Sequence, residues 1–219
     1  MKKACVIIIL FLSSVHTAIG QDDNRNFGNI LQSYHLFKDK DLIEKTIDFT
    51  NNTDMPQSNL EPILTGFFGA LYLQDESIKK KMGANLKQIK NLDIQKLFLH
   101  IASLNIDSVY SKAPINPSYN DMNWSSYFAT GQTKYLDHII ANIQHSENRV
   151  DQKMFLAGAT AKWSLCSNAK KHPAVKEYLT SLQDKNGRIA ELLTNDQVYF
   201  REQVINVIKA QRAKGIWNE

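Results

Sequence analysis

The side chains best suited to bind a ligand lie in two stretches of the sequence. They combine aromatic rings, which stack on planar groups, with amide and charged groups, which fix polar edges. This mixture predicts a groove that holds a ring or a peptide. The seven candidates are Asn120, Asp121, Trp124, Tyr127, Lys162, Trp163 and Asn168.

Four of these candidates also have a structural interpretation. Asp121 follows Ser118 by three residues, so the pair fits a capping box at the start of a helix. Trp124 and Trp163 suit a hydrophobic core, and Asn168 can bond to the backbone of a loop. The residue types alone leave both interpretations open.

Sequence motifs for enzymatic or metal chemistry are absent. The chain contains no HExxH, CxxC, GxSxG, GxxxxGK[ST] or GxGxxG pattern. His138 and His145 are seven residues apart, about two helical turns, which is too far to chelate one ion without other ligands. We therefore assign no catalytic residue and expect neither a metal nor a cofactor. Asn51 and Asn123 begin glycosylation sequons, which matter only in a eukaryotic secretory route.

The first 20 residues predict a cleaved secretory signal peptide. Lys2 and Lys3 precede an apolar run over residues 4–12, and Ala18-Ile19-Gly20 places small residues before Gln21. The run is too short to span a bilayer, which takes about 20 residues. We expect export to the periplasm or the medium, and no membrane association after cleavage.

Charge and cysteine content narrow the classes of partner. The formal net charge is +4, and it falls to +2 without residues 1–20, which hold two lysines and no acid. We therefore expect no nucleic-acid binding, and Lys79, Lys80 and Lys81 suit a solvated helix face. Cys166 is the one cysteine beyond residue 20, so we expect a small buried hydrophobe and no intramolecular disulfide.

The elements that would position these side chains are helices throughout. Apolar residues recur at spacings of three and four, which predicts an all-α fold with no sheet. We expect one domain over residues 21–219, with an internal linker near 112–118 where Pro114 and Pro117 interrupt the helices. Helices are predicted over 29–37, 41–49, 58–73, 76–90, 94–111, 118–130, 134–144, 149–171, 173–182 and 188–193, with a last one from about 195 to 214.

Small polar residues and glycines indicate where these helices begin, end and pack. The predicted N-caps are Ser58, Asp75, Asp93, Ser118 and Thr194. Gly131 should end its helix in a left-handed cap. Gly66, Gly69 and Ala70 would let a neighbouring helix approach closely. In the last helix we expect Val198, Ile205 and Ile208 to face inward.

An internal similarity favours helical hairpins. Residues 33–47 align without gaps to residues 126–140, and each copy reads as an aromatic helix, a tight polar turn and an apolar-apolar-acidic helix. The spacing between copies is not a constant period.

Two longer stretches resemble known proteins. Residues 117–124 with 128–131, and residues 161–169 with His172 and Pro173, are similar to segments of exported bacterial proteins of unassigned function. Their rhythm resembles degenerate tetratricopeptide-like helical hairpins. The resemblance implies an array or bundle of antiparallel hairpins, a tetratricopeptide-like α-solenoid, and no catalytic residue.

Two functions fit these observations. The first is an exported helical protein that binds a peptide or protein partner in a concave groove. The second is an enzyme of unrecognised class with a polar cleft around Asn120, Asp121 and Trp163, or with His138 as a polar group. We favour the first. The sequence does not indicate an oligomeric state.

Overall fold

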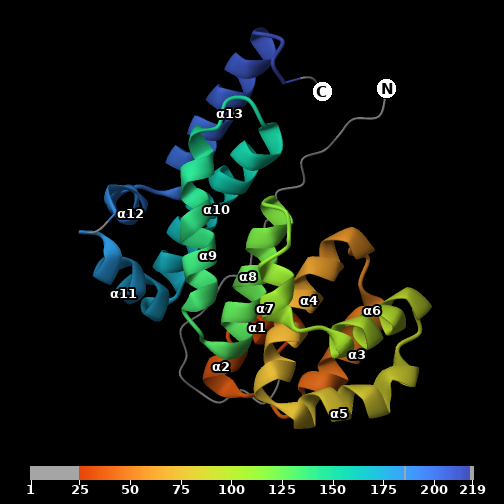
Figure 1. Ribbon diagram of the computed structural model, residues 1–219. Helices are drawn as coiled ribbons and strands as arrows, with labels where there is room; N and C mark the ends of the chain where they lie inside the picture. The colour runs from red at the N-terminus through yellow and green to blue at the C-terminus, as the bar shows by residue number, and fades with distance from the viewer. Residues whose placement is uncertain (1–24, 185, 218–219) are drawn as a thin grey trace. The chain divides into compact units, whose positions relative to one another are not determined.

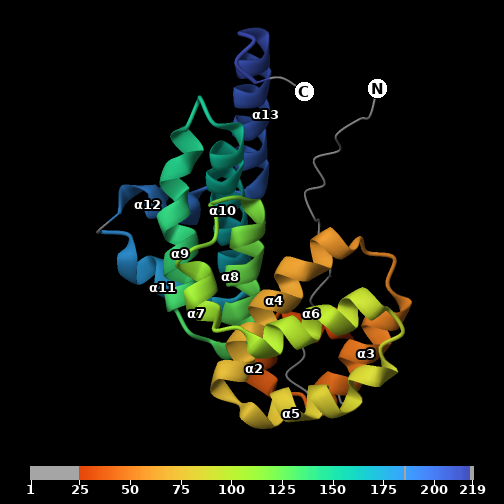
Figure 2. The same ribbon diagram turned by 45° about the vertical axis from the view of Figure 1, so that its right-hand side comes forward.

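The computed structural model describes residues 25–184 and 186–217, and this part of the chain is all-α (Figures 1 and 2). No strand occurs in these ranges, which confirms the predicted fold class. The predicted signal peptide lies outside the described residues. The chain divides into two compact units, with the boundary in the sequence between Leu165 and Cys166.

The larger unit, residues 25–165, holds most of the helices. None of the described helices in either unit is both long and apolar enough to span a lipid bilayer. The elements of the larger unit are α1 (Phe27–Leu31), α2 (Tyr34–Phe37), α3 (Leu42–Asn52), α4 (Gln57–Gln74), α5 (Glu76–Asn85), η1 (Leu86–Gln88), α6 (Leu92–Ser103), α7 (Ile106–Tyr110), α8 (Pro117–Thr130), α9 (Lys134–Asn142) and η2 (Ile143–Glu147), followed by α10 (Gln152–Lys171), within which the boundary falls. The smaller unit holds α11 (Pro173–Leu182), α12 (Gly187–Thr194) and α13 (Gln197–Ala213).

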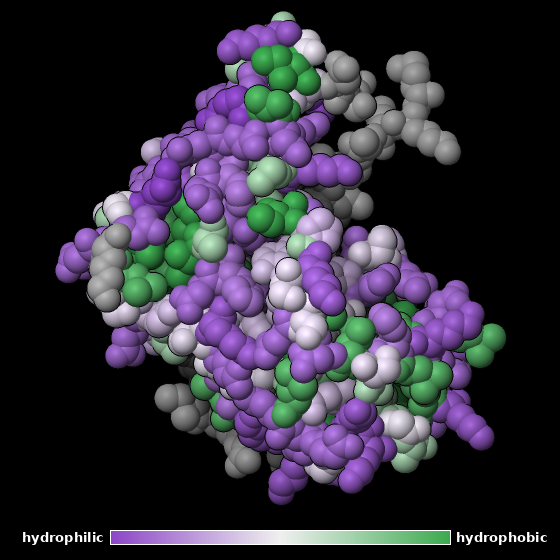
Figure 3. All heavy atoms as spheres, in the orientation of Figure 1, coloured by the Kyte–Doolittle hydropathy of each residue, from purple (hydrophilic) through white to green (hydrophobic). Residues whose placement is uncertain are grey.

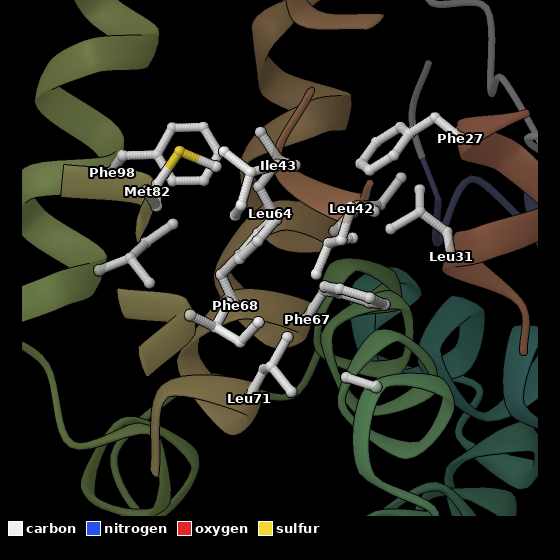
Figure 4. Packing of buried hydrophobic residues seen from close by; sticks show 14 of the residues in the cluster. Phe27, Leu31, Leu42, Ile43, Leu64, Phe67, Phe68, Leu71, Met82 and Phe98 are labelled. Carbon is white, nitrogen blue, oxygen red and sulfur yellow. The ribbon is translucent and has the colours of Figure 1, made fainter. Parts of the chain in front are cut away.

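Helix α4 supplies the centre of the core in the larger unit. Phe67 and Phe68 are fully buried there, and the Phe68 ring lies 5.1 Å from that of Phe98 on α6. Figure 4 shows these rings packed with Leu64 and with aliphatic side chains of α1 and α3. Because α4 carries apolar residues all around, it can be covered by several helices at once.

A glycine lets α8 cross α4 at close range. A Cβ atom on Gly66 would overlap the carbonyl of Met122 and stand 2.8 Å from its Cα. Ser126 Oγ donates a hydrogen bond of 2.8 Å to the Gly66 carbonyl at the same crossing. The close approach predicted from Gly66 is therefore confirmed, and it fixes the helix that carries four of the candidate site residues.

The end of α8 is as predicted, but its cap is not. No helix lies between Tyr110 and Pro117, and Gly131 has the left-handed φ of 74°. The N-cap is Asn116, whose Oδ1 accepts a hydrogen bond of 3.0 Å from the Tyr119 backbone N. Pro117 takes the first helical position, because its missing N–H and fixed φ suit that place. The Ser118 capping box was therefore wrong.

Replacing the true cap should cost more stability than replacing the predicted one. Asn116→Ala is expected to lower the free energy of unfolding by about 1 kcal/mol, because it removes the side-chain acceptor of the Tyr119 amide and leaves only the Asn116 backbone carbonyl at 3.1 Å. Ser118→Ala should change it by less than about 0.5 kcal/mol, since Ser118 is an exposed side chain. Urea denaturation followed by circular dichroism measures both. A larger loss for Ser118→Ala would contradict this assignment.

Other predicted caps divide into one that is confirmed and three that were wrong. Asp75 caps α5 by accepting a bond from Ser77 N at 2.9 Å. Asn91, not Asp93, caps α6, and Asp196, not Thr194, caps α13. Helix α4 begins after Pro56, whose side chain cannot accept, so Ser58 lies within the first turn. In each wrong case an acceptor or a proline one or two residues away takes the position.

Two predicted helices are each divided in the structure. The segment 94–111 ends as α6 at Ser103, and Asn105 then caps the short α7 by accepting from Ser108 N at 3.1 Å. The segment 29–37 forms α1 and α2 with a break at residues 32 and 33. Asparagine competes with helix continuation by bonding to the backbone, which accounts for the first division.

The aligned copies share a backbone feature. Lys38 ends α2 with a left-handed φ of 53°, and the aligned Gly131 ends α8 in the same conformation. In each copy the amide of this residue bonds to the carbonyl of a tyrosine four residues earlier, Tyr34 or Tyr127. The similarity between residues 33–47 and 126–140 therefore extends to the turn between the helices.

Candidate functional site

The first group of predicted site residues lies inside the larger unit. Asn120 is buried, and its Nδ2 donates to the Ala157 carbonyl at 2.7 Å and to Thr160 Oγ1 at 3.0 Å. Its Oδ1 accepts a bond of 2.7 Å from Asn142 Nδ2. All the polar atoms of the Asn120 side chain are thus engaged between α8, α9 and α10.

The two aromatic candidates on α8 are buried as well. Trp124 Nε1 donates to Ser164 Oγ at 2.9 Å, and its ring stacks on Phe128 with centroids 5.5 Å apart. The Tyr127 ring contacts those of Trp124 and His35, and burial raises the pKa of the Tyr127 phenol. The structure places both side chains in the packing of α8 against its neighbours.

The remaining candidates have different surroundings. Lys162 and Trp163 are half-buried on α10, and Asn168 lies in the part of α10 that belongs to the smaller unit. Asp121 is half-buried on α8, and no donor or cation of the described chain pairs with its carboxylate. Burial raises the pKa of Asp121 to about 6. Such a carboxyl changes its charge near neutral pH.

A half-buried histidine on α9 has a defined orientation. His138 Nδ1 lies 2.9 Å from Asn123 Oδ1, and Asn123 Nδ2 donates to the Tyr119 carbonyl at 2.8 Å. Because that carbonyl can only accept, Asn123 must present its oxygen to His138, so Nδ1 carries the proton. Burial lowers the pKa of His138, which leaves Nε2 as an acceptor.

This imidazole lacks the neighbours of a nucleophilic catalyst. Its ring packs among those of Tyr110, Tyr119 and Tyr135, with centroids 5.4 to 6.4 Å away. Within residues 25–184 and 186–217, no serine, threonine or cysteine is hydrogen-bonded to it. His138 is therefore part of the contact between α8 and α9.

Both sequon asparagines are held by the fold. Asn51 Nδ2 donates to the Gln88 carbonyl at 2.9 Å, and Asn51 Oδ1 accepts from Lys90 N at 2.7 Å. Asn123 is fully buried. A glycan on either amide would remove these contacts.

A groove between α1 and α3 is a concave feature that the sequence analysis did not predict. It encloses about 440 Å³, within the range of small-ligand sites, and the rings of Phe27 and Phe49 pack in its wall with centroids 4.7 Å apart. Its lining is Arg25, Asn26, Phe27, Lys45, Asp48, Phe49, Asn52 and Thr53. Sequence patterns carry little signal for this groove, because its lining residues come from two segments, 25–27 and 45–53, that are separated along the chain.

The charged groups of the groove are paired at its edge. Arg25 lies 3.0 Å from Asp39, and Lys45 lies 2.9 Å from Asp41. Asp48 Oδ1 accepts a bond of 2.8 Å from Asn52 Nδ2. These charged side chains therefore already have partners within the protein.

Neutral hydrogen-bonding groups remain available in the groove. Asn26 Oδ1 caps α1, which leaves Asn26 Nδ2 as a donor. Asn52 uses its Nδ2 within α3, which leaves Asn52 Oδ1 as an acceptor. Thr53 Oγ1 accepts from Met55 N, so its hydroxyl proton is still free to be donated. These groups can pair with the C=O and N–H groups of a peptide.

Neither a metal cluster nor a known relative assigns a function. In the part of the chain that the structure describes, no three His, Cys, Asp or Glu side chains lie close enough to hold an ion. Comparison of the chain with protein-family models, curated proteins and solved structures gives no match.

Proposed function

We propose that this chain is an exported helical protein that binds a segment of a peptide or protein partner in the groove between α1 and α3. The observation that carries the proposal is the groove itself, with aromatic rings in its wall and with amide and hydroxyl groups that, among the described residues, keep unused hydrogen-bonding capacity. Export rests on the basic, apolar and small-residue pattern of residues 1–20.

The chemistry of the groove favours a peptide over a charged metabolite. Phe49, which is partly exposed beside the buried Phe27, offers apolar surface for one side chain of a ligand. Asn26, Asn52 and Thr53 offer both donors and an acceptor, which match the alternating groups of a peptide backbone. Since Arg25 and Lys45 are already paired with aspartates, a phosphate or carboxylate would have to displace them.

Selection from a random peptide phage library against residues 21–219 tests the proposal. We expect peptides with an apolar or aromatic anchor to be enriched. Asn52→Trp fills the groove, and it should weaken binding of the selected peptides at least about tenfold, measured by fluorescence anisotropy.

Asn85→Trp is the matched control. Asn85 ends α5 as Asn52 ends α3, and each donates from Nδ2 to the carbonyl four residues earlier. This control should bind the peptides as the native protein does. Failure to enrich any peptide, or equal binding by Asn52→Trp, would rule out the groove as the site.

We also propose that the helices form a tetratricopeptide-like array of hairpins. The shared left-handed turn at Lys38 and Gly131 supports a duplicated hairpin. The packing of α8 on α9 and of α11 on α12 supports pairs of neighbouring helices. Helices α4 and α8 also contact one another extensively although they are far apart in the sequence. The proposed array therefore includes this contact in addition to the stacking of neighbouring repeats.

A further inference from the structure

We propose that α13 is a self-association surface, which pairs antiparallel with α13 of a second copy of this chain. The proposal concerns the smaller unit and does not rest on the groove between α1 and α3. Two apolar side chains of α13 that we expected to be buried are exposed. Val198 and Ile205, which we expected to face inward, are 60 % and 38 % exposed.

Helix α13 buries one face and leaves the opposite face open. Phe200 and Gln211 are its buried residues. On the opposite side, residues spaced by four and three form one stripe along the helix. We call this the α13 stripe: Val198, Glu202, Ile205, Lys209 and Arg212, all of them exposed. Figure 3 shows hydrophobic side chains interrupting the hydrophilic surface in the region of α13.

The order of residues in the stripe is self-complementary. In an antiparallel pair with its two-fold axis beside Ile205, Glu202 faces the partner's Lys209, and Lys209 faces the partner's Glu202. Ile205 faces the partner's Ile205, and Val198 packs along the aliphatic part of the partner's Arg212. Each apolar residue of the stripe is thereby covered, and two ion pairs form.

The charges of the stripe are free to make these pairs. Among the described residues, neither Glu202 nor Lys209 has an ion-pair partner. They are seven residues apart, too far to pair along one helix, whereas intrahelical pairs need a spacing of three or four. On an anionic membrane Glu202 would stay without an opposite charge beside Lys209 and Arg212, whereas the antiparallel pair gives both Glu202 and Lys209 an opposite charge. The mixed charge therefore favours a second copy over a lipid surface.

A contact of one helix with one helix is small, so the dimer should be weak. Sedimentation velocity of residues 21–219 between about 10 µM and 1 mM should show a concentration-dependent monomer–dimer equilibrium. Glu202→Lys and Lys209→Glu each place like charges opposite one another twice per dimer. Each is expected to weaken association at least about tenfold.

The double variant Glu202→Lys/Lys209→Glu restores opposite charges and should recover association to within about threefold of the native protein. Lys176→Glu on α11, an exposed site off the stripe, makes the same charge change and should have no effect. Circular dichroism of every variant shows that it is folded.

Three results would overturn the proposal. The native protein could stay monomeric over the whole concentration range. The single variants could associate as the native protein does. The double variant could fail to recover, which would exclude the antiparallel register. If these side chains only stabilised the fold, the double variant would not recover association. Its recovery therefore indicates direct pairing between the two copies.

Discussion

Gly158→Ala is expected to lower the free energy of unfolding by about 3 kcal/mol, the upper range for overpacking a close contact. Gly158 on α10 faces η2, where a Cβ atom would overlap the backbone of His145 and Ser146 and stand 2.7 Å from Ser146 Cα. These atoms belong to the main chain, so no side chain can rotate to make room. Either α10 or η2 has to move.

The movement would also disturb the polar contacts next to it. Ala157, the neighbour of Gly158, provides the carbonyl that accepts from the buried Asn120. Shifting α10 away from η2 would stretch this bond and leave buried polar groups unpaired, which adds to the cost.

Gly83→Ala is the matched control for this substitution. Gly83 also lies within a helix, α5, but a Cβ atom there would meet no atom within 4 Å. It should stabilise the protein by about 0.5 to 1 kcal/mol, since alanine favours the helix. Urea denaturation of both variants measures the difference. If Gly158→Ala unfolded at the same urea concentration as Gly83→Ala, the close contact of α10 with η2 would be excluded.

Local features of the fold could be predicted where proline or glycine sets the backbone. The predicted helix 173–182 has the observed bounds, because Pro173 suits a first helical position. Gly131 ends α8 because a left-handed residue is needed there. Caps were less predictable, since neighbouring acceptors such as Ser118 and Asn116 compete and the proline between them decides.

The candidate site depended on contacts that no local pattern encodes. Asn120 and Asn142 are 22 residues apart, and their bond exists only because α8 and α9 pack together. An asparagine in a sequence is equally compatible with binding a ligand and with joining two helices by buried hydrogen bonds. Only the residues that pack against it distinguish the two roles. The groove was missed for the same reason, because Phe27 and Phe49 come together only when α1 packs on α3.

Asp121→Asn is expected to stabilise the protein at neutral pH and to remove part of its pH dependence. Burial raises the pKa of Asp121 from its ordinary 3.8 to about 6, so the folded protein holds this proton more tightly than the unfolded chain does. The stability that protonation provides is present below about pH 4 and is lost as the pH rises through about 6.

The size of the effect follows from the shift in pKa. A rise of about two in the pKa corresponds to a free-energy difference of about 3 kcal/mol. Because the side chain is partly exposed, we expect a smaller difference of about 2 kcal/mol. The native free energy of unfolding should therefore fall by about this amount between about pH 4 and pH 7.5, relative to the variant. Urea denaturation of both proteins across this range measures it. Asp54→Asn, at an exposed aspartate, is the control and should run parallel to the native protein.

The same variant separates the two roles that Asp121 could have. If the Asp121 carboxylate capped α8, its conversion to the amide would destabilise the protein. The cap is Asn116, so we expect no loss of stability at neutral pH. If Asp121→Asn were less stable than the native protein at about pH 7.5, the carboxylate must have a stabilising partner when charged. No such partner occurs among the described residues, so we expect Asp121→Asn to be more stable than the native protein at this pH. Above about pH 6 the charged carboxylate destabilises the native fold.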